Sequence, residues 1–202
     1  MLRILNRVLV AIILPVLVLH CSLANAQGSF TGRVAVEWLT GQNPERDMKL
    51  LEPFTFTDPA SKLWHVPAGT VVNGASIPRG FWTLVGSPYT GNYRRASVVH
   101  DYYCDTKNEP WAAVHRMFYH AMVAGGVSEL EAKVLYGAVY AGGPRWDIVV
   151  TKNLHGAEER IVIPRSVVIS DQAQQEANSW IRSTNPSLEE IEHRLEAQVT
   201  VQ

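Results

Sequence analysis

The sequence has few cysteines, little charge bias and no long hydrophobic run, and each shortage excludes a class of protein. Only 2 of the 202 residues are cysteine, which excludes a disulfide-rich scaffold. The formal net charge is −1 at pH 7, so the chain lacks the basic character that a nucleic-acid partner requires, and we expect none. A hydrophobic content of 47% is instead typical of a globular domain with a real core.

The first 26 residues have the pattern of a secretory signal peptide. Arg3 and Arg7 give a positive start, an apolar run covers residues 8–19, and small residues occupy positions 24 and 26. We therefore predict cleavage before Gln27 and a periplasmic or secreted bacterial protein. The apolar run is about a dozen residues, against roughly 20 for a membrane-spanning helix, so we expect no stable membrane span after cleavage.

Cys21 raises the alternative of a lipid-modified protein. His20 precedes it, where lipid attachment usually requires a small residue, so cleavage before Gln27 is favoured. That cleavage leaves Cys104 as the one thiol of the mature chain. We expect Cys104 to be buried, because thiols in oxidising compartments are usually paired, buried or used in chemistry.

Hydrophobic spacing predicts an α+β fold. Residues 30–72 alternate between apolar and polar positions with turn residues between them, which indicates a small N-terminal antiparallel sheet. The spacing then becomes helical and predicts a three-helix core. The predicted helices cover residues 92–104, 110–124 and 129–141.

The pattern weakens after residue 150. Two short strands are predicted at residues 161–163 and 167–169, on either side of Pro164. Residues 171–178 form either a helix or a link, and an amphipathic helix begins after Ser187. We thus predict a single globular domain over residues 28–150 and a peripheral C-terminal extension over residues 151–202 that carries this amphipathic helix.

Polar groups capable of chemistry gather on the first two predicted helices. If these helices form an antiparallel hairpin, His100 and His115 each lie about seven and a half residues from its midpoint and therefore face each other. Helical spacing places Cys104 on the side of His100, with Asp101 one step round the helix. We expect these four groups at the mouth of the hairpin, with His115 at the edge of the core face.

Three chemistries remain open for such a cluster. His100 could act as a general base on water, with Asp101 as its orienter or as a cation ligand and His115 as second base or ligand. Two imidazoles with a carboxylate or thiolate could instead bind a divalent cation such as zinc. Cys104 and His100 could also form a nucleophile and base pair. The alternative without chemistry is a set of hydrogen-bonded core residues.

A loop rich in small residues supplies the other candidates. Asn73 and Gly74 form a tight-turn pair, and small side chains here allow a ligand or helix to approach the backbone. Ser76 is a candidate catalytic hydroxyl, although serine is most common in turns and helix caps.

Several blocks together resemble the domain-of-unknown-function 1353 family of bacteria and their phages. These blocks are Pro67–Gly69, Asn73–Pro78, Ala96–Tyr102, Phe118 with Met122, Gly126–Val127 and Gly143–Trp146, and the resemblance covers about residues 50–147. It implies no settled activity. Many relatives have Asp in place of Asn73 and an Ala-Asp pair in place of Val114–His115, which weakens a metal assignment.

The adjacent His100 and Asp101 also resemble, over one helix, the His-Asp pair of phospholipase A2. There the resemblance implies a water-activating histidine, a calcium-binding aspartate and a loop of carbonyl ligands, for which Asn73–Gly74 would stand. This chain departs from that pattern at His115, where an acid is expected, and in lacking the disulfide framework.

These observations lead to two hypotheses from different classes. The first is an exported hydrolase that acts on a cell-envelope substrate, either a lipid ester or a peptidoglycan bond, with His100, Asp101, His115 and Ser76 at its site. The second is a non-catalytic periplasmic or phage-derived binding protein, in which the polar cluster only holds the helices to the loop and surface aromatics contact a protein partner.

Overall fold

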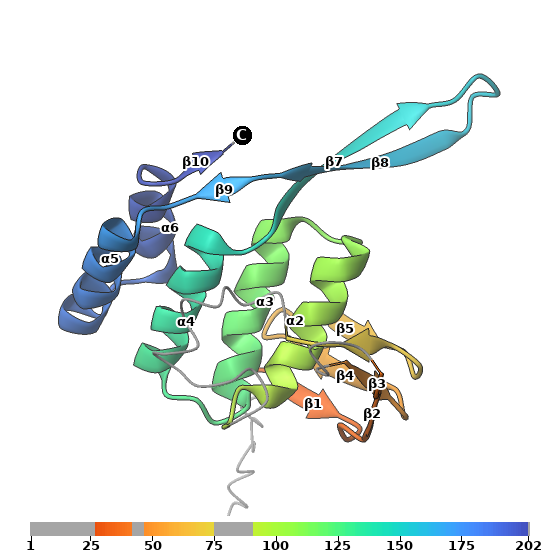
Figure 1. The fold of residues 1–202 in the computed structure, drawn as a ribbon, viewed down its shortest axis with the longest axis horizontal. Helices are drawn as coiled ribbons and strands as arrows, with labels where there is room; N and C mark the ends of the chain where they lie inside the picture. The colour runs from red at the N-terminus through yellow and green to blue at the C-terminus, as the bar shows by residue number, and fades with distance from the viewer. Residues whose placement is uncertain (1–26, 42–46, 75–90, 202) are drawn as a thin grey trace, which may run out of the picture.

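The computed structural model describes residues 27–41, 47–74 and 91–201, and its architecture confirms the α+β class. Small antiparallel sheets come first, three helices follow, and further strands and helices complete the chain (Figure 1). The predicted signal peptide and Ser76 both lie outside the described residues.

Two three-stranded sheets occupy the N-terminal part, where a single small sheet is expected. The first has the order β1 (Ser29–Thr31), β4 (Phe54–Thr57), β5 (Leu63–Val66), and the second has the order β2 (Val36–Trp38), β3 (Met48–Leu50), β6 (Val71–Val72). Alternation along β4 buries Phe54 and Phe56, and the same alternation in β5 buries Trp64 and Val66. The chain bends at residues 51–53, so β3 and β4 pair with different partners and the sheet divides.

Three helices form the main core with these sheets: the first two contact the strands, and the third packs against the second. They are α2 (Arg94–Thr106), α3 (Trp111–Ala124) and α4 (Glu129–Gly142), each within two residues of its predicted bounds. Lys107 ends α2 in the left-handed region, and Pro110 occupies the N-cap of α3. The hydroxyl of Ser128 accepts a hydrogen bond from the backbone N–H of Glu131 and caps α4. The short turn between α2 and α3 makes them antiparallel neighbours.

A long two-stranded ribbon follows the helices and projects from the body of the molecule (Figure 1). It pairs β7 (Arg145–Lys152) with β8 (Glu158–Arg165) along their whole length. The predicted strand at residues 161–163 is therefore part of a longer one, and β7 is absent from the sequence prediction. Pro164 lies within β8 and not between two strands, which is tolerated because β8 pairs on one side only, with β7.

The C-terminal part returns to the helical core. A short strand pair, β9 (Val167–Val168) and β10 (Thr200–Val201), brackets α5 (Asp171–Thr184) and α6 (Leu188–Glu196). Ser187 begins α6 with a complete capping box, as its sequence suggests. Ile181, Ile191 and Leu195 are buried against α4 in a second apolar cluster. No helix in the described part of the chain combines the length and hydrophobicity needed to cross a bilayer.

Candidate functional site

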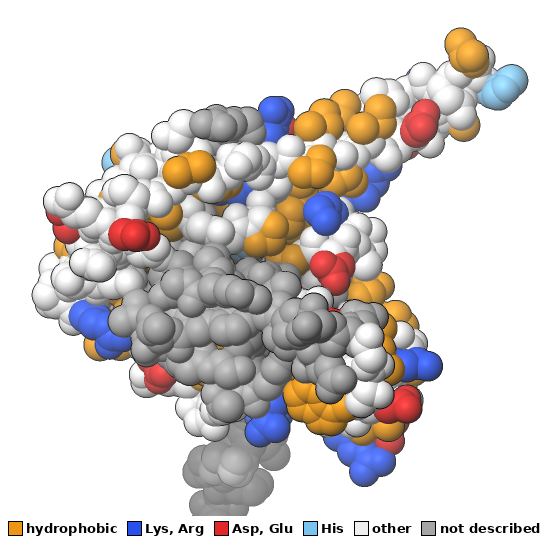
Figure 2. Space-filling model, in the orientation of Figure 1, with side chains coloured by type: hydrophobic (Ala, Val, Ile, Leu, Met, Phe, Trp, Pro, Cys, Tyr) orange, Lys and Arg blue, Asp and Glu red, His pale blue; other side chains and the backbone are white. Residues whose placement is uncertain are grey.

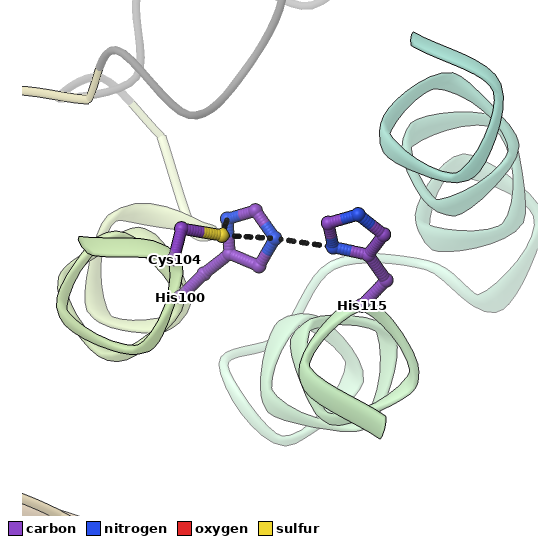
Figure 3. A group of neighbouring side chains, drawn as sticks. All are labelled: His100, Cys104 and His115. Atoms are coloured by element: carbon purple, nitrogen blue, oxygen red, sulfur yellow. Dashed lines mark hydrogen bonds between the residues drawn. The ribbon is translucent and has the colours of Figure 1, made fainter. Parts of the chain in front are cut away.

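The two histidines of the helical hairpin face each other, as the spacing predicts. Nε2 of His100 on α2 lies 2.9 Å from Nδ1 of His115 on α3, within hydrogen-bond distance (Figure 3). One ring nitrogen must donate and the other accept, so at least one imidazole presents a lone pair along this line. The hairpin thus places two imidazoles, 15 residues apart in the sequence, in direct contact.

The pair is more deeply buried than expected. The exposed fraction is 1% for His100 and 0% for His115, so the expectation of a cluster at the hairpin mouth is wrong. The Phe118 ring lies tilted against the His100 ring at a centroid distance of 4.5 Å, and Trp111 meets His115 edge-on at 5.6 Å. Gly143 closes the far side, because a Cβ atom there would lie 3.1 Å from Nε2 of His115.

Cys104 completes a group of three ligand-type side chains. One helical turn after His100, its Sγ lies 3.5 Å from Nε2 and 3.9 Å from Nδ1 of that imidazole. One ligand atom from each of His100, Cys104 and His115 can be chosen so that all three lie within 4.8 Å of one another. The thiol is buried, as expected, and it lies against the His100 ring (Figure 3).

Asp101 faces a different partner. Its Oδ2 accepts hydrogen bonds from the backbone N–H groups of Asn73, at 2.7 Å, and Gly74, at 2.9 Å. The predicted loop and helix are therefore brought together. The turn meets Asp101 through these two N–H groups. The structure gives Asp101 an anchoring contact, and the ligand-type group that forms around His100 contains Cys104 instead.

Burial controls the protonation of both histidines. Desolvation lowers the pKa of His100 to about 4, and the negative charge of Asp101 only partly opposes this. Desolvation also holds the pKa of His115 well below its ordinary value, with His100 and Arg145 acting in the same direction and the Pro144 carbonyl opposing them. Both imidazoles are therefore neutral at pH 7, the form that binds metals and accepts protons.

Arg145, to which the sequence analysis gives no role, is buried beside this site. Its guanidinium stacks on Trp111 at 4.1 Å, donates to the Tyr140 carbonyl at 3.0 Å and pairs with Glu196 at 3.1 Å. The sequence signal was its place in the Gly143–Trp146 block of the family resemblance. A buried arginine at the start of β7 thus links the histidine site to α6.

Comparison with known proteins supports the family resemblance. Residues 48–139 match a family model described as "Protein of unknown function (DUF1353)". The resemblance is confirmed over this segment. The DUF1353 match contains His100, Asp101, Cys104 and His115.

Two relatives come from Sinorhizobium fredii. One, named "Uncharacterized protein y4jT", is 42% identical over 121 residues, which cover 60% of this chain and 36% of that protein. The other, "Uncharacterized protein y4iH", is 37% identical over 130 residues, which cover 64% of this chain and 54% of that protein. The chain therefore aligns with only about a third to a half of each relative's length. No solved structure matches it significantly.

Proposed function

We propose that this protein is an exported hydrolase of the bacterial cell envelope, whose water-activating centre is the His100–His115 pair. The 2.9 Å contact between two buried, neutral imidazoles, with a thiol against one of them, is the observation that carries the proposal. Substrates of the proposed class are lipid esters or peptidoglycan bonds.

The two imidazoles can activate water by accepting its proton in succession. A neutral imidazole accepts a proton from water, and a second imidazole in contact can accept it in turn and stabilise the cation that forms. Asp101 acts as a positioning residue, because it holds the Asn73–Gly74 turn beside the helix that carries His100. The low pKa of His100 makes it a weak base at neutral pH, so the centre needs an additional activating group.

Hydrolysis assays on envelope lipids and on purified peptidoglycan test the proposal. We expect His100→Gln to lower the rate by about 10²–10⁴-fold, the usual contribution of a general base. The exposed ribbon residue His155 supplies the matched control, and His155→Gln should retain activity. Unfolding temperatures of both variants separate a catalytic loss from a folding loss. Equal rates for wild type and folded His100→Gln would overturn the proposal.

Export is tested separately on the native protein. Mass spectrometry of protein recovered from the periplasm should find Gln27 as the first residue. A lipid-modified Cys21 at the N-terminus would support the lipoprotein alternative, and an intact Met1 in the cytoplasmic fraction would contradict export.

The projecting ribbon favours a second candidate function, that of a non-catalytic binding protein. Figure 2 shows hydrophobic side chains along its visible face. Val150 and Leu154 are 61% and 102% exposed, and three further apolar side chains on the ribbon are also exposed: Val149, Ile161 and Ile163. Under this function, Val150→Glu would abolish binding of an envelope protein, whereas folded His100→Gln would bind normally.

A further inference from the structure

We propose that His100, Cys104 and His115 bind one zinc-class divalent metal ion through Nε2, Sγ and Nδ1, with the fourth coordination position open to water. This ligand set differs from the one expected from sequence, because Cys104 replaces Asp101. The inference rests on the proposed hydrolase and changes the role of its histidines: with an ion bound, the two imidazoles hold the ion, and the ion activates the water in their place. Metal binding can be measured without any substrate.

Two of the three ligand separations can be compared directly with tetrahedral coordination. Zinc bonds of about 2.0–2.1 Å to nitrogen and 2.3 Å to sulfur place two nitrogens about 3.3 Å apart and a nitrogen and sulfur about 3.5 Å apart. The Sγ of Cys104 lies 3.5 Å from Nε2 of His100, which matches. The two imidazole nitrogens are 2.9 Å apart, so an ion that replaces their hydrogen bond needs them to separate by about 0.4 Å and needs both rings to turn until their lone pairs converge on the ion.

The chemistry of the donors selects the metal class. Two imidazoles and one thiolate suit zinc and related transition ions, whereas calcium and magnesium require oxygen ligands. Three protein ligands are also the number found in catalytic zinc sites, which keep one position for water. Such water has a pKa near 7, which would supply the activation that two weakly basic imidazoles lack.

The second ring nitrogen of His115 has a neighbour that can fix its tautomer. Its Nε2 is fully buried, and the Pro144 carbonyl that acts on the pKa of this ring lies next to it, although the contact falls outside strict hydrogen-bond geometry. Metal binding at Nδ1 requires the proton to be on Nε2, where the neighbouring Pro144 carbonyl is available to orient it. The ring would thereby gain the fixed tautomer that metal-bound histidines usually have.

The surrounding charges are compatible with a cation. Arg145 is the positive group that acts on His115, but its charge is paired with Glu196 at 3.1 Å. Asp101 adds negative charge next to His100 without being a ligand. Binding converts the Cys104 thiol to a thiolate and releases its proton to solvent, so a divalent ion leaves the three-ligand centre with a net charge of about +1.

The protein purified as the cell produces it provides the test. We expect elemental analysis to find one zinc per chain. After removal of zinc with a chelator, added Co²⁺ should give the visible bands of a tetrahedral site and a thiolate-to-cobalt charge-transfer band. Addition of Zn²⁺ to the metal-free protein should raise its unfolding temperature.

Matched variants identify the ligands. Cys104→Ser should remove the charge-transfer band, and His115→Asn should weaken Co²⁺ binding by more than about tenfold, since even outer-shell partners contribute that much. His120→Asn, on the same helix as His115 but outside the cluster, should bind as wild type does. Absence of both zinc and cobalt binding in wild type would overturn the inference, and so would a charge-transfer band that survives in Cys104→Ser.

The two proposals can fail independently. One metal per chain without hydrolysis of any envelope substrate supports the metal site and rejects the hydrolase. Hydrolysis that depends on His100 in wild-type protein that binds neither zinc nor cobalt supports the hydrolase and rejects the metal site. If His115→Asn does not fold, the wild-type stoichiometry and charge-transfer band still decide the question.

Discussion

Oδ2 of Asp101 lies 2.9 Å from the backbone nitrogen of Gly74 and accepts its hydrogen bond, so the helix next to His100 holds the turn that follows β6. The same oxygen accepts from Asn73 at 2.7 Å. A buried carboxylate with two backbone donors is a strong anchor, because hydrogen bonds to charged groups contribute more than neutral ones.

Asp101→Ala should therefore destabilise the protein by about 2–3 kcal/mol, because the N–H groups of Asn73 and Gly74 lose their shared acceptor. Urea unfolding measures the change. Asp105→Ala, at an exposed position one turn further along α2, is the control and should cost less than about 0.5 kcal/mol. Similar losses in the two variants would contradict the anchoring role.

Helical spacing predicted the histidine contact because it depends on local geometry. The positions of His100 and His115 about a common turn determine that they face each other once the hairpin forms, and Cys104 follows from the helical repeat. The depth of burial depends instead on α4 and Gly143, which approach from elsewhere in the chain. Spacing within one helix contains no information about that approach.

Asp101 and β7 were harder to predict for the same reason. Asp101 follows His100 and therefore points to another side of the helix. Its hydrogen-bond partners become known only once the fold places the Asn73–Gly74 turn beside it. The β7 strand contains Arg145, Trp146 and Asp147 at its start, so its hydrophobic alternation is weak. Its pairing with β8 through a short turn defines the strand.

Gly143→Ala should disturb both the stability and the metal centre. A Cβ atom at this position would lie 2.3 Å from the carbonyl oxygen of Val139, a backbone atom that cannot move without distorting the end of α4. It would also lie 3.1 Å from Nε2 of His115. We expect a loss of about 1–3 kcal/mol in unfolding free energy and weaker Co²⁺ binding. Wild-type values for both would show that this close contact is unimportant.

The pH dependence of stability should include a contribution from His120. Burial and the positive charge of Arg116 lower its pKa, with Asp58 opposing them. As the pH falls through about 6.5, His120 takes up a proton in the unfolded state before it does so in the folded state. The free energy of unfolding is therefore unaffected by this residue above that pH and decreases below it. Between pH 8 and 5, the unfolding free energy of the metal-free protein should fall less steeply with pH in His120→Gln than in wild type. The difference in slope should correspond to a fraction of one bound proton. Parallel curves would contradict the prediction.

Ile181→Ala tests how firmly the C-terminal helices are joined to the helical core. Ile181 is fully buried. If Gly137 carried a Cβ atom, that atom would lie only 2.8 Å from Cδ1 of Ile181, so α5 can approach α4 this closely only because residue 137 has no side chain. Truncation leaves a cavity in the cluster with Ile191 and Leu195 and should cost about 2–5 kcal/mol.

The exposed ribbon residue Leu154 supplies the control, and Leu154→Ala should change stability by less than about 0.5 kcal/mol. Hydrogen exchange in Ile181→Ala should accelerate first in α5 and α6, because these helices depend on the second apolar cluster, while α2 and α3 belong to the main core. The metal stoichiometry should remain that of wild type in the folded variant. Simultaneous acceleration in all the helices would mean that both clusters unfold as one unit and that residues 171–196 are integral to the domain.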